Sequence, residues 1–144
     1  MSTSTSTSIA DPASLNSSAF QKGVEVAGRI LLATLFLISG LGKIGSYTAT
    51  AGYMSSVGVP AALLPLVIAT EVGGALSIIV GWKTRVTAFL LAGFTLLTAF
   101  IFHNNFADQI QMLMFLKNAS IAGAFLLLAA NGAGPLSIDR RLAQ

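Results

Sequence analysis

The chain alternates long apolar runs with short polar segments. Four of the runs are long enough to cross a membrane, because about 20 apolar residues span the hydrocarbon core of a bilayer as an α-helix. These runs cover residues 24–44, 61–81, 86–102 and 112–130. The pattern predicts an all-α fold, an integral membrane bundle of four transmembrane helices.

Residues 45–59, between the first two runs, carry no charge and are followed by Pro60. Tyr47, Ala51 and Met54 recur at helical spacing within this segment, and tyrosine is enriched at the level of the lipid headgroups. We therefore predict a short interfacial helix between spans 1 and 2.

The first 22 residues form a Ser/Thr-rich tract without the basic and apolar regions of a signal peptide. Such a composition is typical of a flexible tail. The sequence therefore divides into a flexible tail, residues 1–22, and a transmembrane domain, residues 23–144.

Composition supports membrane insertion and excludes several kinds of site. Hydrophobic residues make up 54% of the chain and charged residues 9%, with a mean hydropathy of +0.80, far outside the soluble range. The basic residues behind the net charge of +3 are scattered, so nucleic acid is not an expected partner. With no cysteine and one histidine, the chain offers no Cys-ligated cluster and no bis-His haem site. We predict no metal and no covalently bound cofactor, so electron chemistry would need a diffusible or partner-borne cofactor.

The placement of the basic residues predicts the orientation of the bundle. With four spans, one side of the membrane receives Lys22, Arg29, Lys83, Arg85, Arg140 and Arg141. The positive-inside rule assigns that side to the cytoplasm. Both termini are therefore expected in the cytoplasm.

Glu71 is the only charged residue of the second run and lies near its middle. A charged side chain near the bilayer centre costs on the order of 3 kcal/mol, so it needs a partner. Lys43, at the end of the first run, and Lys117, in the fourth, are the two candidates. The alternative is a purely structural carboxyl, protonated or internally paired, although ionisable groups inside spans are functional by default.

A cluster of polar groups can form in the outer half of the bundle, because helical side chains lean toward the N-terminus of their own helix. If their faces align, the groups that converge there are Glu71, Lys117, Lys43 and His103. Asn118 follows Lys117, and apolar walls would come from Phe36, Phe102 and Phe115. Arg29 belongs to the same helical stripe as Lys43 and is a further candidate for ligand binding.

Several segments resemble the DoxX family. In the first span they are Arg29 and the run FLISGLGK at residues 36–43. The others are the run ATEVGGALSIIVGWKTR, the histidine at the end of the third span, and the run FLKNASIAGAFLLLA with the later DRR. The resemblance covers residues 28–141 and is closest to proteobacterial inner-membrane members, many without assigned function. It implies a four-helix membrane bundle in the bacterial inner membrane. Its polar positions map to Arg29, Lys43, Glu71, His103, Lys117 and Asn118. Asn104 departs from the pattern, because some relatives carry a second histidine there, and this weakens any argument for metal or haem ligation.

For some members the resemblance implies subunits of thiosulfate:quinone oxidoreductases or quinol oxidases, and for others membrane anchors of oxidative-stress complexes. The first hypothesis is therefore a quinone-interacting redox subunit whose outer-half polar cluster binds the quinone headgroup or an anion. In it, Glu71 would transfer protons and Lys117 would hydrogen-bond a quinone oxygen. Ligand-binding roles would fall to Lys43, His103, Asn118 and Arg29. Its partners would be the lipid bilayer, a quinone and a soluble or membrane oxidoreductase.

Two other classes remain open. The second is a non-enzymatic anchor or scaffold for such an oxidoreductase or stress complex. The third is a small proton-coupled carrier, which the lack of an evident inverted repeat disfavours. A stripe of small residues in the second span, which permits a homodimer, consists of Thr70, Gly73, Ser77 and Gly81.

Overall fold

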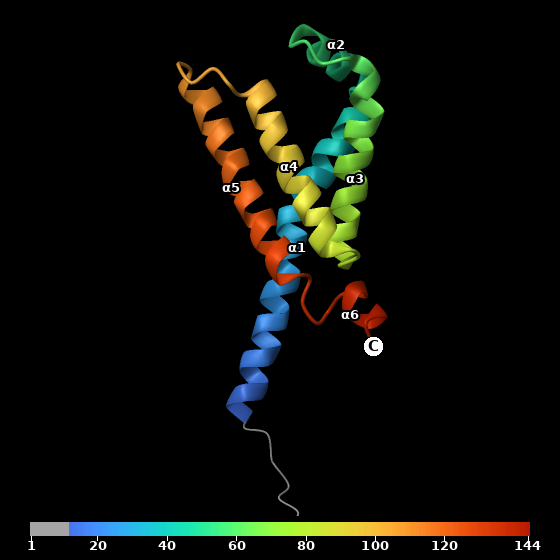
Figure 1. The fold of residues 1–144 in the computed structure, drawn as a ribbon, viewed down its shortest axis with the longest axis vertical. Coiled ribbons are helices and arrows are strands. Elements are labelled where there is room, and N and C mark those ends of the chain that lie inside the picture. The colour runs from blue at the N-terminus through green and yellow to red at the C-terminus, as the bar shows by residue number, and fades with distance from the viewer. Residues whose placement is uncertain (1–11) are drawn as a thin grey trace, which may run out of the picture.

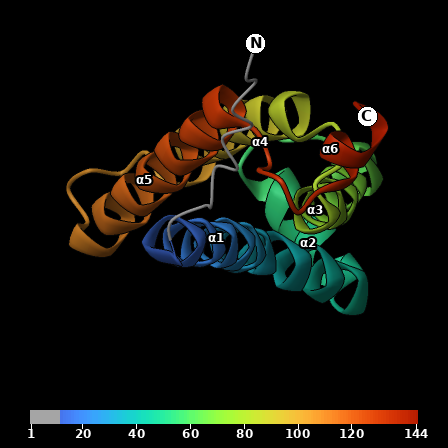
Figure 2. The ribbon, with the colours of Figure 1, turned by 90° about the horizontal axis from the view of Figure 1, so that it is seen from below.

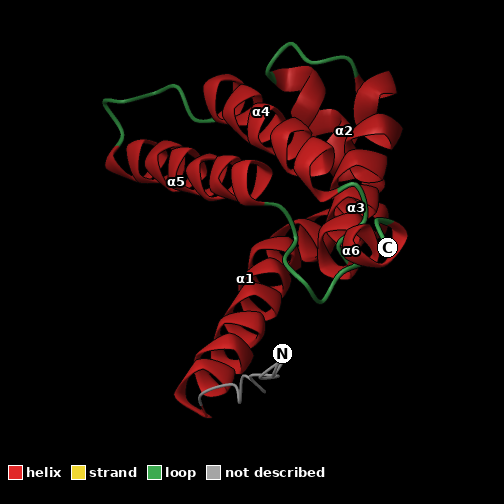
Figure 3. Ribbon diagram, turned by 60° about the horizontal axis from the view of Figure 1, so that its bottom comes forward, coloured by secondary structure: helices red, strands yellow, loops and turns green. Residues whose placement is uncertain are grey.

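A computed structural model describes residues 12–144, and for residues 12–17 the backbone only. All regular elements of this part are helical. They are α1 (Pro12–Gly45), α2 (Tyr47–Ser56), the 3-10 turn η1 (Ala61–Leu63), α3 (Leu64–Val80), α4 (Thr84–Phe102), α5 (Gln109–Asn131) and α6 (Ile138–Leu142) (Figure 1). Short loops join them (Figure 3). The predicted all-α class is confirmed.

Four of these helices are long and apolar enough to cross a membrane. They cover Ser18–Gly45, Ala61–Val80, Thr84–Phe102 and Gln109–Asn131. The four predicted spans are therefore confirmed, and the short helix α2 lies between the first two as expected. Pro65 lies in the first turn of α3, where the missing N–H has no intrahelical partner to lose.

The first helix begins earlier than expected. Residues 12–22, predicted to belong to a flexible tail, continue α1, whereas residues 1–11 lie outside the described part of the chain. The 34 residues of α1 correspond to about 51 Å at 1.5 Å per residue, well beyond a hydrocarbon core of about 30 Å. The N-terminal part of α1 accordingly stands clear of the other spans (Figure 1).

The bundle has two chemically different ends, which we name by their contents. The basic end carries the α3–α4 turn with Lys83 and Arg85, and α6 with Arg140 and Arg141. The α2 end carries α2 and the loop from His103 to Asp108.

The four spans form two pairs, α1 with α3 and α4 with α5, and the pairs meet along α3 and α4 (Figure 2). Gly40 brings α1 close to α3, because a Cβ at this position would lie 2.6 Å from Cγ2 of Val72. Phe36 and Phe125 join α1 to α5, with their ring centroids 5.2 Å apart in an edge-to-face arrangement.

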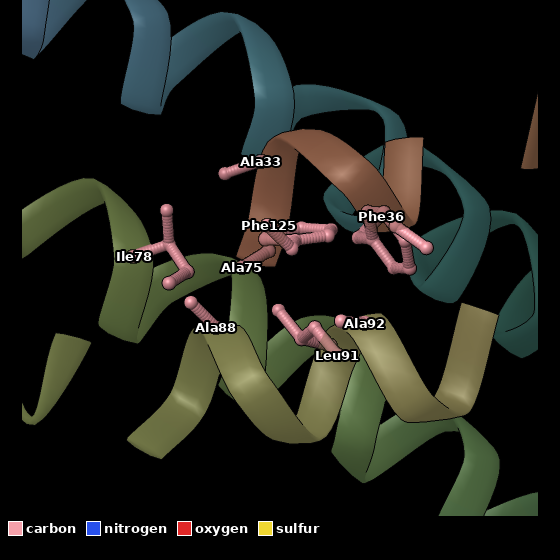
Figure 4. Packing of buried hydrophobic residues seen from close by; sticks show 9 residues of the cluster. Ala33, Phe36, Ala75, Ile78, Ala88, Leu91, Ala92 and Phe125 are labelled. Atoms are coloured by element: carbon pink, nitrogen blue, oxygen red, sulfur yellow. The ribbon is translucent and has the colours of Figure 1, made fainter. Parts of the chain in front are cut away.

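The main cluster of buried apolar residues lies in the half of the bundle nearer the basic end. Its buried members are Ala33, Phe36, Ala75, Ile78, Ala88, Leu91, Ala92, Ala122 and Phe125 (Figure 4). On α3 these residues come after Glu71 in the sequence, and on α4 they come before Thr95. The cluster therefore ends at the level of these two polar residues. The half nearer the α2 end has fewer buried apolar residues, among them Leu64 and Ala99, and contains a cavity.

The C-terminal segment closes the basic end. Asp139 Oδ1 accepts a hydrogen bond from the N–H of Lys83 at 2.6 Å, and Oδ2 accepts one from the N–H of Thr84 at 2.8 Å. Partial burial raises the pKa of the Asp139 carboxyl, but these hydrogen bonds outweigh burial and leave the pKa below its ordinary value of 3.8. The contact also holds Lys83 in a left-handed conformation (φ 45°) that side chains rarely adopt.

Candidate functional site

Lys43 and Glu71 form an ion pair between α1 and α3. Lys43 Nζ lies 2.9 Å from Oε1 and 2.8 Å from Oε2 of Glu71. The Glu71 side chain is 8% exposed and that of Lys43 is 24% exposed. Of the two partners that the sequence left open for Glu71, the structure pairs it with Lys43.

The local sequence of α1 explains why Lys43 can reach Glu71. The ideal Cβ position of Gly40 is 3.1 Å from Cβ of Glu71, so only a glycine lets the two helices approach this closely. Ser39, one turn before Lys43, accepts a hydrogen bond from Nζ at 2.7 Å and donates one to Glu71 Oε1 at 3.3 Å. The lysine and the carboxylate therefore share a polar neighbour at a point where α1 and α3 touch.

The ion pair borders a cavity of about 500 Å³ in the half of the bundle nearer the α2 end. The predicted site residues that line it are Lys43, Glu71, His103, Lys117 and Asn118. Its walls are mostly apolar and include Phe36, Phe94 and Phe102. Five of the six residues singled out from the sequence thus meet in one place, on four different spans.

His103 directly follows α4 as its C-cap residue, is half-buried and lines the cavity. Its Nδ1 lies 2.8 Å from Oε1 of Gln111. With the amide oxygen as acceptor, Nδ1 carries the proton of the neutral ring, which leaves Nε2 as an acceptor. His103 can therefore accept a hydrogen bond from a hydroxyl group within the cavity.

Lys117 lines the same cavity from α5 but is exposed and forms no ion pair among the described residues. Its Nζ donates to the sulfur of Met114, at 3.3 Å. A thioether is a weak acceptor and carries no charge. Because Lys43 is neutralised by Glu71, Lys117 gives the cavity a surplus positive charge.

Two expected members of the site lie elsewhere. Arg29 is at the basic end, 3% exposed, where its Nη2 donates to the carbonyl of Leu136 at 2.6 Å. It shares a helical stripe with Lys43, but a separation of 14 positions in the sequence places the two about 21 Å apart along α1. Phe115, expected as a wall, packs instead against Phe100 and Phe106 outside the cavity.

Helix α2 supplies part of the site that the sequence did not predict. Thr50, Tyr53 and Met54 line the cavity, and the Tyr53 ring stacks on Phe102 with centroids 5.6 Å apart. The helix therefore covers the cavity at the α2 end. Ser39 was also missed, although its spacing of four residues from Lys43 was a usable signal.

The fold and this cavity define a class: a small four-span membrane protein with an ion-paired, ligand-sized chamber in one half of its bundle. Residues 25–104 match the DoxX family. Inner membrane protein YqjF of Escherichia coli (strain K12) is 57% identical over 120 residues, which cover 83% of this chain and 92% of that protein. Inner membrane protein YphA of the same organism is 42% identical over 120 residues, 78% of this chain and 86% of that protein. The chain belongs to the DoxX family and is an inner-membrane protein, as the resemblance implied. No solved structure matches it.

No cluster of three or more His, Cys, Asp and Glu side chains suited to a metal ion occurs within the described residues.

Proposed function

We propose that the cavity binds the headgroup of a quinone or quinol, and that the protein is the quinone-interacting subunit of a membrane redox system. The observation that carries this proposal is the placement of Lys117: an unneutralised cation on the wall of a mostly apolar chamber. Ligand sites of this kind combine apolar walls with a few placed polar groups.

The rim of the cavity supports entry from the lipid phase. Leu35, Leu66 and Leu97 line it and are 47%, 64% and 59% exposed. In a membrane these exposed leucines face acyl chains. A lipid-soluble ligand with an apolar tail can therefore leave its tail in the bilayer while its ring enters the chamber.

The polar groups suit the two oxygens of a quinone ring. Lys117 would donate to one oxygen and stabilise the negative charge that develops there on reduction. His103, with Nε2 as an acceptor, would take a hydrogen bond from the hydroxyl of a quinol. Asn118, next to Lys117, lines the same wall and can donate or accept.

The Lys43–Glu71 pair would serve proton transfer. Oxidation of a quinol to a quinone releases two protons and two electrons. Glu71 can accept a proton, after which Lys43 keeps Ser39 as its hydrogen-bond partner. The electrons would pass to the cofactor of a partner oxidoreductase, because this chain has no cysteine and a single histidine.

The basic end is proposed to face the cytoplasm, which would place the cavity in the periplasmic half of the inner membrane. Lys83, Arg85, Arg140 and Arg141 support this orientation through the positive-inside rule. Protons from a quinol would then leave on the periplasmic side.

A second candidate function is a membrane anchor or scaffold, and one observation favours it. Ser39, Lys43 and Glu71 bond to one another, as expected of a charged group that only fixes the register of two helices. The N-terminal part of α1, which stands clear of the bundle, would offer a soluble partner a place to dock (Figure 1).

Quinone content separates the two functions. Protein purified in mild detergent is extracted with organic solvent, and quinone is quantified per chain for the wild type, Lys117→Met and the control Lys83→Met. Lys117→Met keeps the aliphatic stem and removes the charge, so we expect it to lose the quinone that the wild type and the control retain. Folded wild-type protein that still lacks quinone after incubation with it would exclude the redox function and favour the anchor.

A further inference from the structure

We propose a second binding site, at the basic end, for the phosphodiester headgroup of an anionic phospholipid such as phosphatidylglycerol. It is a groove of about 890 Å³ between the α3–α4 turn, the end of α5 and α6. Three basic side chains line it: Lys83, Arg85 and Arg140. The groove lies at the opposite end of the bundle from the quinone cavity and does not depend on that proposal.

The groove keeps a net positive charge. Lys83, Arg85 and Arg140 are all exposed, and Asp139 is the one acidic residue among the described residues that line it. The Asp139 carboxylate accepts hydrogen bonds from the backbone N–H groups of Lys83 and Thr84. No ion pair joins it to a basic side chain within the described part. Three basic groups and one carboxylate leave two positive charges for a ligand.

Two of the basic residues are held in position. Arg85 donates from Nη1 to the carbonyl of Ala130 at 2.8 Å and from Nη2 to that of Asn131 at 3.5 Å. A guanidinium has five N–H donors, so donors remain for the oxygens of a phosphate. The backbone N–H of Lys83 is hydrogen-bonded to Asp139, and this contact fixes the position of the Lys83 Cα from which the side chain extends.

The depth of the groove in the membrane indicates a lipid. Trp82, directly before Lys83, is 45% exposed at the end of a membrane-spanning helix, a position typical of the headgroup region. Basic pockets at this level bind anionic lipid headgroups. Free phosphate has the same oxygen chemistry, but only a lipid also places acyl chains beside Trp82.

Trp82 provides a local readout, because it is the only tryptophan of the chain. The full-length protein is reconstituted into vesicles of phosphatidylcholine and phosphatidylglycerol, with one of the two lipids brominated on its acyl chains. Quenching of Trp82 fluorescence then gives the relative affinity of the two lipids at this end of the bundle. We expect wild-type protein to prefer phosphatidylglycerol by about fivefold, the value for one basic side chain at an anionic surface.

The neighbouring arginines supply matched variants. Arg140 lines the groove and Arg141 does not, although both are exposed on the same short helix. Arg140→Gln and Lys83→Gln should each lower the preference, whereas Arg141→Gln should leave it unchanged. Circular dichroism of each reconstituted variant verifies that the helices are intact.

Two results would overturn the proposal. Equal losses in Arg140→Gln and Arg141→Gln would show a diffuse surface charge rather than a site. No preference for phosphatidylglycerol over phosphatidylcholine in the wild-type protein would show that the groove does not bind a phospholipid headgroup, even if inorganic phosphate binds there.

Discussion

Lys43 donates to both carboxylate oxygens of Glu71, and this pair crosses from α1 to α3 beside the cavity. Removing one member of a buried pair leaves the other charged and unpartnered, which typically costs about 3–5 kcal/mol. We expect Glu71→Ala to destabilise the protein by about 3 kcal/mol, and Glu71→Gln by less because an amide keeps hydrogen bonding. Unfolding of the protein in mixed detergent micelles measures both.

A double-mutant cycle tests which lysine is the partner. Glu71→Ala combined with Lys43→Ala should be less destabilising than the sum of the single changes, because no orphan charge remains. Glu71→Ala combined with Lys117→Ala should be additive, since Glu71 pairs with Lys43 and Lys117 contacts Met114 instead. A larger coupling for Lys117 than for Lys43 would show that the pairing described above is wrong.

Gly40 gives a prediction on helix packing. A Cβ at Gly40 would lie 2.6 Å from Cγ2 of Val72, and Val72 is β-branched and therefore stiff. Gly40→Ala should destabilise the protein by about 1–3 kcal/mol and weaken the Lys43–Glu71 contact by separating the helices. Gly42→Ala is the control, because a Cβ there meets nothing within 4 Å and should be neutral or stabilising. Equal effects of the two substitutions would contradict the close approach of α1 and α3.

The basic end should respond to acid through Asp139. The folded-state pKa of this carboxyl lies below its ordinary value of 3.8, so its contribution to stability is complete above that value and is lost as the pH falls through the folded pKa. Trp82 fluorescence should therefore be constant from neutral pH down to about 4 and change only below it. In Asp139→Asn this acid step should be absent. A step centred above pH 5, or one that persists in Asp139→Asn, would assign the response to another group.

Topology is tested with single cysteines, which is simple because the chain has none of its own. Ser46, Asn105 and Ala143 are exposed, the first two at the α2 end and the third at the basic end. In intact cells, a membrane-impermeant maleimide should label Ser46→Cys and Asn105→Cys but not Ala143→Cys. The reverse pattern would invert the proposed orientation.

The spans could be predicted from sequence because hydropathy and length suffice to find them. The partner of Glu71 could not, because the choice between Lys43 and Lys117 depends on how far each helix is rotated. That rotation is set by packing at Gly40 and between Phe36 and Phe125. The periodic pattern of apolar residues in the sequence does not specify these contacts.

Arg29 was wrongly assigned to the site, and other parts of the site were not predicted. Arg29 shares a helical face with Lys43, but its place near the start of the first span already put it on the cytoplasmic side, away from the cluster in the outer half. Gln111 reaches His103 only through the path of the loop between α4 and α5. The position of α2 over the cavity depends on the fold of the α2–η1 connection, whereas the existence of α2 itself was evident from the sequence.

We propose that a quinone ring occupies the cavity beside Lys117, and photolabelling with an azidoquinone, followed by mass spectrometry of the peptides, tests this. We expect labels on cavity-lining residues of α4 and α5, among them Phe94, Phe102 and Asn118, with loss of labelling in excess natural quinone and in Lys117→Met. Labels confined to lipid-facing residues such as Phe89 or Leu127, and insensitive to both treatments, would contradict it.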